Sequence, residues 1–290
     1  MNKNILVTGS NGQVGSELKE LSTSYSQYNF YFTDRTMLDI TNKTEIQKFC
    51  KTNNINIILN CAAYTAVDKA EEDTQNAKKV NHLATTFLAE VSKDLDISLI
   101  HISTDYVFDG KSFKPYIENM PVAPQGVYGQ TKLDGERSLQ NINPKNSIII
   151  RTSWVYSSFG ANFVKTMLKL GSQRDELGVI FDQVGTPTYA KDLASTILNI
   201  IPKIDNINVD IFHFSNEGVC SWYDFAKTIF ELSNISCKVN PIETKEYPTP
   251  ASRPHYSLLN KAKIKKTYNI NIPYWKDSLK ECLNILKENK

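Results

Sequence analysis

The first 150 residues alternate short, continuous apolar runs with longer amphipathic stretches, and this alternation restricts the fold more than any other feature of the chain. Continuous apolar runs are typical of strands buried on both faces, whereas the longer stretches carry their apolar residues at helical spacing. The rhythm predicts an α/β fold with a doubly wound parallel sheet and right-handed crossovers. The predicted strands are Asn4–Thr8, Asn29–Thr33, Ile55–Leu59, Ser98–Ile102 and Ser147–Ile150, and the helices between them are Gln13–Leu21, Thr44–Lys51, Asn76–Asp94 and Thr131–Leu139.

The rhythm loosens after Arg151, where prolines and aromatic residues become frequent. We expect the sheet domain to span 1–153 and to be rejoined by about 191–214, because Val209–Phe214 reads as one further strand. A smaller, irregular region is expected to comprise 154–190 and 215–290, with Pro241–Pro254 neither helix nor strand. The helices predicted after Arg151 are Ala161–Leu170, Lys191–Ile201, Trp222–Leu232 and Trp275–Leu286.

Charge and composition exclude several classes of protein. The 290 residues carry a formal net charge of +2, and 41% of them are hydrophobic, which is ordinary for a globular protein and argues against a nucleic-acid binder. The longest basic cluster, Lys261–Lys266, is expected to be a solvated helix face. No apolar run approaches the ~20 residues of a membrane span, and we expect no signal peptide, because Met1-Asn2-Lys3-Asn4 leads directly into the first predicted strand.

The five cysteines and four histidines are scattered, without a C-x-x-C pair or another metal-ligand spacing. We therefore expect neither a disulfide framework nor a metal site, and a cytoplasmic protein with reduced thiols.

A glycine-rich loop connects the first predicted strand to the first helix. Gly9, Gly12 and Gly15 are spaced three apart, which permits a tight turn, a close approach of the backbone to a pyrophosphate and close helix–strand packing. The helix N-terminus then offers N–H groups and a positive dipole end to phosphates. The loop thus predicts a Rossmann-like, NAD(P)-binding domain.

The second predicted strand ends at Asp34-Arg35, where such sites contact the adenosine ribose. An acidic residue there binds the ribose 2′-hydroxyl, and an arginine accommodates a 2′-phosphate. Because the two residues are adjacent, the sequence leaves NADH and NADPH equally open.

Tyr128 and Lys132 form a Tyr-x-x-x-Lys pair, with both side chains on one helix face. A lysine ammonium, aided by a nicotinamide cation, would lower the pKa of the tyrosine toward neutrality and make it a proton donor. With 14 tyrosines and 28 lysines, about one such pair is expected by chance, and a second pair, Tyr223–Lys227, does occur. Tyr128 is favoured because it follows the strand that ends in Ser103-Thr104-Asp105, and Thr104 there can hydrogen-bond a substrate carbonyl.

Taken together, these elements resemble the extended short-chain dehydrogenases/reductases and, within them, the dTDP-4-dehydrorhamnose reductase family. The segments that carry the resemblance run nearly end to end, at 7–15, 60–71, 103–110, 127–132, 151–156 and 247–254.

The resemblance implies a role for each matching position. It implies cofactor contacts from the phosphate loop, the adenine side and the loop after the third strand, catalysis by three residues, and substrate contacts from both regions. The implied cofactor residues are Gly9, Gly12, Gln13, Val14, Gly15, Asp34, Arg35, Asp39, Ile40, Ala62, Ala63, Tyr64, Thr65, Tyr128 and Lys132. The implied catalytic residues are Thr104, Tyr128 and Lys132, and the implied substrate contacts are Thr104, Asp105, Trp154 and Arg253.

The implied reaction is NAD(P)H-dependent reduction of the C4 ketone of dTDP-4-dehydro-β-L-rhamnose to dTDP-L-rhamnose, the last step of dTDP-rhamnose synthesis, with Tyr128 as proton donor. Two alternatives stay open: another nucleotide-sugar reductase or epimerase of the same fold, and a non-catalytic regulatory subunit such as that of methionine adenosyltransferase. Some relatives bind Mg²⁺ at a homodimer interface, but their acidic ligands have no clear equivalents in this chain. The product stereochemistry, rhamnose or talose, is also left open.

Overall fold

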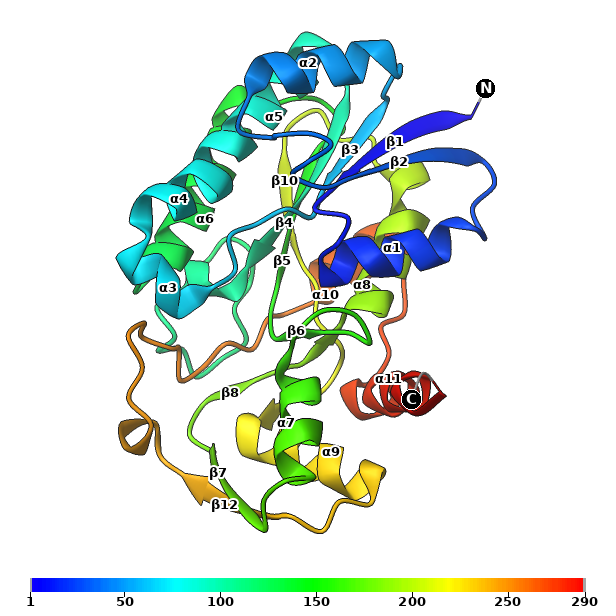
Figure 1. Ribbon diagram of the computed structural model, residues 1–290. Helices are drawn as coiled ribbons and strands as arrows, with labels where there is room; N and C mark the ends of the chain where they lie inside the picture. The colour runs from blue at the N-terminus through cyan, green and yellow to red at the C-terminus, as the bar shows by residue number, and fades with distance from the viewer. Residues whose placement is uncertain (1, 289–290) are drawn as a thin grey trace.

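A six-stranded parallel sheet organises the first region of the molecule, in the order β10-β5-β4-β3-β1-β2 (Figure 1). The structure is a computed structural model and describes residues 2–288. Because β1 is flanked by β2 on one side and β3 on the other, the strand order reverses at β1, as a doubly wound sheet requires. The strands are β1 (Lys3–Thr8), β2 (Tyr28–Thr33), β3 (Ile57–Asn60), β4 (Ser98–Thr104), β5 (Ile148–Thr152) and β10 (Asp210–His213).

Helices cover both faces of this sheet, and each strand divides its side chains between them. In β1, Ile5 and Val7 pack with Leu18 of α1, whereas Leu6 packs with Ile46 of α2 on the other face. This two-sided burial explains the continuous apolar runs. The first face is covered by α1 (Gln13–Ser22), α8 (Ala190–Ile200) and α10 (Ala262–Tyr268), and the second by α2 (Lys43–Thr52), α5 (Ala84–Asp94) and α6 (Val127–Ile142).

The helix predicted over Asn76–Asp94 is interrupted. It comprises α4 (Thr74–Lys78), a π-helical turn over Lys79–Leu83, and α5, and it is preceded by α3 (Val67–Glu72), which the sequence pattern did not predict. The π-helical turn brings the side chain of Asn81 into the protein interior, where it is 1% exposed. Such turns are frequent at functional sites.

Residues 191–214 do return to the sheet, since they supply α8 and the edge strand β10. The expectation that all of 215–290 belongs to the second region is wrong, however. Ile264, Tyr268 and Ile272 pack in the same core cluster as β1 and β5. Their apolar spacing was obscured by the lysines between them.

The second region lies below the sheet in Figure 1 and has a separate core. Its short strand pairs are β6 with β9, β8 with β11, and β7 with β12. Pro241 lies in β12, so the stretch Pro241–Pro254 is not wholly irregular as expected; a proline is tolerated because β12 pairs on one side only. The elements are β6 (Val155–Tyr156), α7 (Phe163–Gly171), β7 (Glu176–Ile180), β8 (Val184–Gly185), β9 (Thr188–Tyr189), β11 (Cys220–Ser221), α9 (Trp222–Ser233), β12 (Lys238–Ile242) and α11 (Trp275–Glu288).

The basic cluster Lys261–Lys266 does lie at α10, but it is not simply a solvated face. Lys261, only 7% exposed, and Lys265 both pair with Glu217, and Lys263 pairs with Asp210 of β10. These ion pairs attach α10 to the sheet edge and to the second region.

Candidate active site

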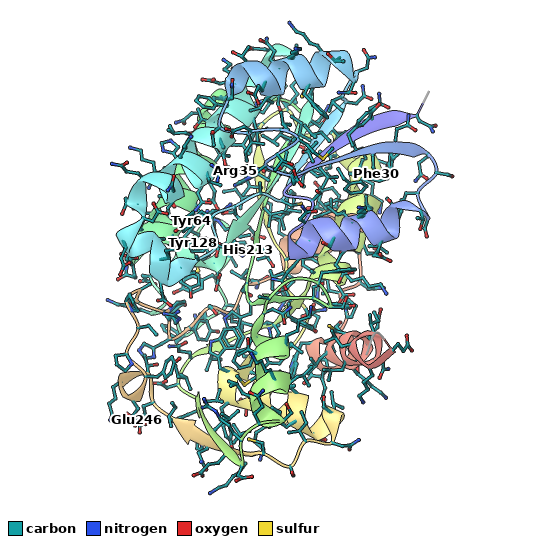
Figure 2. The ribbon with its side chains drawn as sticks, in the orientation of Figure 1. Phe30, Arg35, Tyr64, Tyr128, His213 and Glu246 are labelled. Atoms are coloured by element: carbon teal, nitrogen blue, oxygen red, sulfur yellow. The ribbon has the colours of Figure 1, made fainter. Side chains whose placement is uncertain are left out.

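One cleft of about 1300 Å³ runs along the carboxyl ends of the parallel strands and continues between the two regions. Doubly wound sheets bind their ligands at this edge, where the strand order reverses. The cleft brings together all but one of the site residues predicted from the sequence, the exception being Gly15. Figure 2 shows Arg35, Tyr64 and Tyr128 following one another from the end of β2 toward the second region.

The phosphate loop lies at the start of α1. Gly12 is the N-cap of this helix and has no side chain to cap it, and Gly12, Gln13 and Val14 line the cleft. The N–H groups of the first helical turn have no intrahelical acceptors and are therefore available to a phosphate. Gly15 lies behind the loop instead, because a Cβ there would come within 2.5 Å of the carbonyl oxygen of Gly9. Gly15 thus serves the close packing of helix and loop.

Asp34 and Arg35, the two residues that left the cofactor preference open, have different surroundings. The Asp34 carboxylate accepts hydrogen bonds from the Thr36 amide at 2.9 Å, the Thr36 hydroxyl at 2.7 Å and the Asn11 side chain at 3.0 Å. These bonds, those of Thr36 foremost, lower the pKa of Asp34. Arg35 is exposed in the cleft, and within residues 2–288 no carboxylate forms an ion pair with it.

Two further segments line the cleft, as the sequence predicted. Asp39 and Ile40, which are expected to flank the adenine, lie after β2, and the loop after β3 contributes Ala62, Ala63, Tyr64 and Thr65. The Asp39 carboxylate binds the Thr41 hydroxyl at 2.7 Å and amide at 2.9 Å, which lowers its pKa.

Asn81, which the sequence analysis did not identify, holds the loop after β3 in place. Its side chain accepts a hydrogen bond from the Tyr64 amide at 2.8 Å and donates to the Tyr64 carbonyl at 3.2 Å. It also donates to the Thr131 hydroxyl, beside Lys132 on α6. A buried amide inside a predicted helix is the signal that could have revealed it, because such a group needs partners.

Tyr128 and Thr104 meet at the middle of the cleft. Burial raises the pKa of Tyr128 to about 12, and a hydrogen bond with Thr104 acts in the opposite direction. Burial thus opposes the lowered pKa that the sequence predicts for Tyr128 in the presence of a lysine ammonium and a nicotinamide cation. Tyr106 packs edge-on against the Tyr128 ring, with centroids 5.4 Å apart, and fixes its orientation.

Lys132 is 1% exposed, and burial lowers its pKa to about 8. Its Nζ donates to the carbonyl oxygen of Ile102 at 2.6 Å and lies 3.2 Å from Nε2 of His101. The lysine is thus held from the strand side, by β4, while it lines the cleft beside Tyr128.

Asp105 follows Thr104 at the end of β4 and is 3% exposed. Its Oδ1 accepts a hydrogen bond from the Thr104 hydroxyl at 2.9 Å, whereas Oδ2 has no partner within residues 2–288. Burial raises the pKa of Asp105 to about 7. An unpartnered, buried carboxyl oxygen at a cleft wall is well placed to bind a ligand hydroxyl.

The second region contributes a wall of aromatic rings. Trp154 stacks on Trp222 with ring centroids 3.6 Å apart and an interplanar angle of 10°, and Phe163 lies 4.6 Å from Trp222. Trp154 adopts a left-handed backbone conformation, φ +47°, which is rare for a bulky residue. The surrounding structure imposes this strained conformation, and it holds the indole in the cleft.

Arg253 lines the cleft but is already paired. Its guanidinium donates to both carboxylate oxygens of Asp68 on α3, at 2.9 and 2.6 Å. The sequence predicted a ligand contact; the structure shows a link between the segment 247–254 and the sheet domain. Arg253 can bind a ligand only through its remaining N–H groups, or after its ion pair with Asp68 is broken.

The part of the chain that the structure describes contains no cluster of three or more His, Cys, Asp or Glu side chains that could hold a metal ion. Its helices are all too short or too polar to cross a membrane.

Comparison with known proteins places this site in a family. A family model described as the RmlD substrate binding domain matches residues 3–288. The chain belongs to this family. A dTDP-4-dehydrorhamnose reductase of Aggregatibacter actinomycetemcomitans is 42% identical over 286 residues, which cover 95% of this chain and 97% of that protein.

Solved structures of the RmlD family superpose on nearly the whole chain. A dTDP-4-dehydrorhamnose reductase of Clostridium acetobutylicum is 44% identical and gives a TM-score of 0.93 over 98% of this chain and 99% of that one. The enzyme of Bacillus anthracis, solved in complex with NADP, is 36% identical with a TM-score of 0.93 and covers 98% and 100% of the two chains.

Proposed function

We propose that this protein catalyses the NAD(P)H-dependent reduction of the C4 ketone of dTDP-4-dehydro-β-L-rhamnose to dTDP-L-rhamnose. The observation that carries the proposal is that one cleft joins the open N-terminus of α1 to Thr104, Tyr128 and Lys132 and to the aromatic wall. The relatives named above carry this activity in their names, and they match the chain end to end.

The residues fit a dinucleotide along the strand ends. Gln13 and Val14 would bind the pyrophosphate, and the small side chains of Ala62 and Ala63 leave room beside the strand ends. Lys132 would hold the nicotinamide ribose. When bound, NAD(P)H supplies the hydride.

Tyr128 donates its phenolic proton to the oxygen of the reduced carbonyl, and Thr104 hydrogen-bonds the same oxygen. Thr104 and Tyr128 both line this part of the cleft, and the Thr104 hydroxyl, which donates to Asp105 in the structure, would turn to the carbonyl oxygen. Burial disfavours the phenolate, so positive charge from Lys132 and from the cofactor is needed to bring the pKa of Tyr128 toward neutrality. Asp105 and Trp154 would hold the sugar.

Arg35 would pair with the 2′-phosphate of NADPH, because the Asp34 carboxylate is already bound by its own loop and by Asn11. An Arg–phosphate pair is a strong, charge-assisted interaction. We therefore expect NADPH to be preferred over NADH.

The residues 154–189 and 215–261 would form the nucleotide-sugar side of the cleft, and the sheet domain, with 190–214 and 262–272, the cofactor side. The five cysteines are all free, which is typical of proteins in a reducing compartment and supports a cytoplasmic location.

The test is oxidation of NADPH, and then of NADH, in the presence of dTDP-4-dehydro-β-L-rhamnose generated by the upstream epimerase. Oxidation with dTDP-L-rhamnose as product would support the proposal. With the substrate verified in the mixture, absence of oxidation would contradict it. Stoichiometric NAD carried through purification would favour an epimerase, which retains its cofactor through the catalytic cycle.

A further inference from the structure

A row of buried polar side chains crosses the sheet beneath Lys132. Thr8 of β1, Asn60 of β3 and His101 of β4 are register partners on three adjacent strands. Each of them, and Lys132, is at most 1% exposed. Thr8 and Asn60 are the last residues of their strands, and polar side chains buried at this edge are costly unless they are hydrogen-bonded.

These side chains form one continuous hydrogen-bond chain that ends on the lysine. The Thr8 hydroxyl donates to Asn60 Oδ1 at 2.7 Å, Asn60 Nδ2 lies 2.9 Å from His101 Nδ1, and His101 Nε2 lies 3.2 Å from Lys132 Nζ. The chain reaches the cleft at both of its ends, at Thr8 and at Lys132, and its effect on the surroundings of Tyr128 is exerted through Lys132.

The direction of the hydrogen bonds depends on the protonation of Lys132. Burial lowers the pKa of His101 well below its usual value, so its ring is neutral, with one donor and one acceptor nitrogen. An ammonium at Lys132 must donate to Nε2, which places the ring hydrogen on Nδ1 and requires Asn60 to offer its oxygen. A neutral amine instead accepts from Nε2–H, and Asn60 then donates to Nδ1, as in the structure.

The Lys132 nitrogen keeps the same hydrogen-bond partners in both protonation states. In the ammonium, one hydrogen binds His101, one binds the Ile102 carbonyl and one remains. In the amine, the lone pair accepts from His101, one hydrogen binds Ile102 and again one remains. The contacts to His101 and Ile102 are thus kept in either state, and a single N–H is left over for the cleft.

We propose that His101 is a positioning residue for Lys132, and that the chain Thr8–Asn60–His101 reverses its hydrogen bonds as Lys132 gains or loses a proton, so that the lysine keeps one N–H aimed at the cleft. This inference rests on the proposed function for its catalytic consequence, but not for the hydrogen-bond reversal itself. Besides His101, the titratable groups near Lys132 are Glu136 on α6, bound by Arg151 of β5, Cys61 after β3, and Tyr128 in the cleft.

The reversal can be measured without cofactor or substrate. In protein labelled with ¹⁵N-histidine, the His101 signals are assigned by their loss in the variant His101→Gln. As the pH rises through the pKa of Lys132, about 8, the ring hydrogen should move from Nδ1 to Nε2. In the variant Lys132→Met this change should disappear. A His101 tautomer that is constant across this pH range in the wild type would overturn the proposal.

Two amide substitutions separate the contacts of His101. Glutamine reaches the position of Nε2 and can still bind Lys132, whereas asparagine reaches only the position of Nδ1 and can bind Asn60 alone. We expect His101→Asn to lower kcat at least tenfold and to shift its pH profile, and His101→Gln to cause the smaller loss. Equal losses with an unchanged pH profile would mean that His101 only fills space.

His213 provides the matched control, since it is equally buried, lies on β10 and bonds the Tyr116 carbonyl instead. His213→Asn and His213→Gln should lower Tm as the His101 variants do, without shifting the pH profile of kcat. If the wild-type protein does not reduce the nucleotide sugar while its His101 tautomer still follows pH, the proposed function fails and the hydrogen-bond reversal stands.

Discussion

The two sides of the cleft differ in the side chains that form their cores and in the backbone that carries the cleft residues. The sheet domain is packed with aliphatic side chains on paired parallel strands of four to seven residues, and its contributions to the cleft are strand ends and a helix N-terminus. The second region is packed around stacked rings, among them the pairs Tyr156–Tyr189 and Phe163–Phe225, and it contributes side chains from strands of two to five residues.

The difference indicates that the two sides of the cleft bind different parts of the ligands. Backbone N–H groups at strand and helix ends recognise phosphates, which every dinucleotide has, and they need only a regular sheet to hold them. Aromatic side chains held by irregular backbone are typical of the walls of ligand pockets, and we propose that they hold the nucleotide sugar here. We therefore expect substitutions in the sheet domain to change the affinity for the cofactor, and substitutions in the second region to change KM for the substrate. Substitutions where the two regions meet should change the turnover number.

The largest effect is expected from Tyr128→Phe, which removes the proposed proton donor between the two regions. Turnover should fall about 100- to 10,000-fold, with the affinity for NADPH unchanged in fluorescence titration. Tyr223→Phe is the matched control, because Tyr223–Lys227 has the same spacing on α9, away from the cleft. Comparable losses in both variants would contradict the assignment of Tyr128.

A smaller and more selective effect is expected from Trp154→Ala. Loss of the stack with Trp222 removes one wall of the sugar side and should raise KM for the nucleotide sugar about 10- to 100-fold. Because Trp154 belongs to the second region, the dissociation constant for NADPH should change less than twofold. An equal loss of cofactor affinity would show that the division between the regions is wrong.

Arg35→Ala should affect only one cofactor. Removal of the proposed charge-assisted bond to the 2′-phosphate should raise KM for NADPH about 5- to 20-fold and leave KM for NADH unchanged. Arg174→Ala, an exposed arginine of the second region, serves as the control for net charge. A parallel rise for both cofactors would mean that Arg35 acts on the adenosine common to both.

The smallest effect concerns stability rather than turnover. The pKa of Asp105 is raised to about 7 in the folded protein, above its value in the unfolded chain, so between about pH 4 and 7 the folded state binds the extra proton. Stability therefore falls as pH rises through this window. Asp105→Asn removes this dependence, so its Tm relative to wild type should increase from pH 4 to pH 8, as calorimetry can measure. Asp205→Asn, at an exposed position, should show no such trend.

The sheet and the cofactor loop could be predicted because both follow from periodicity and spacing. The run Ile5–Val7 identifies β1 whatever surrounds it, and the glycines behind it identify the turn. The left-handed conformation of Trp154, by contrast, depends on tertiary contacts with Trp222, and no local pattern encodes it.

The site residues that were not predicted from the sequence share one property: each holds another residue of the site in place through a hydrogen bond or an ion pair. Asn81 supports the Tyr64 loop from a π-helical turn, and Asp68 pairs with Arg253 from more than 180 positions away. Asn60 and His101 are partners only because β3 and β4 align in register. Spacing along the chain carries no information about such pairs, whereas Tyr128 and Lys132, one helical turn apart, could be found from it.

The return of residues 190–213 to the sheet has a consequence for biosynthesis. When the ribosome has translated β5, the nascent sheet still lacks its edge strand β10 and the helix α8, which covers one face together with α1 and α10, and both β10 and α8 follow only after 153–189. An uncovered apolar face and an open strand edge invite association with other chains. The nascent protein should therefore depend on chaperones or on rapid completion over this interval. Native structure is expected to form late, once α10 and α11 have emerged to seal the cores of the two regions.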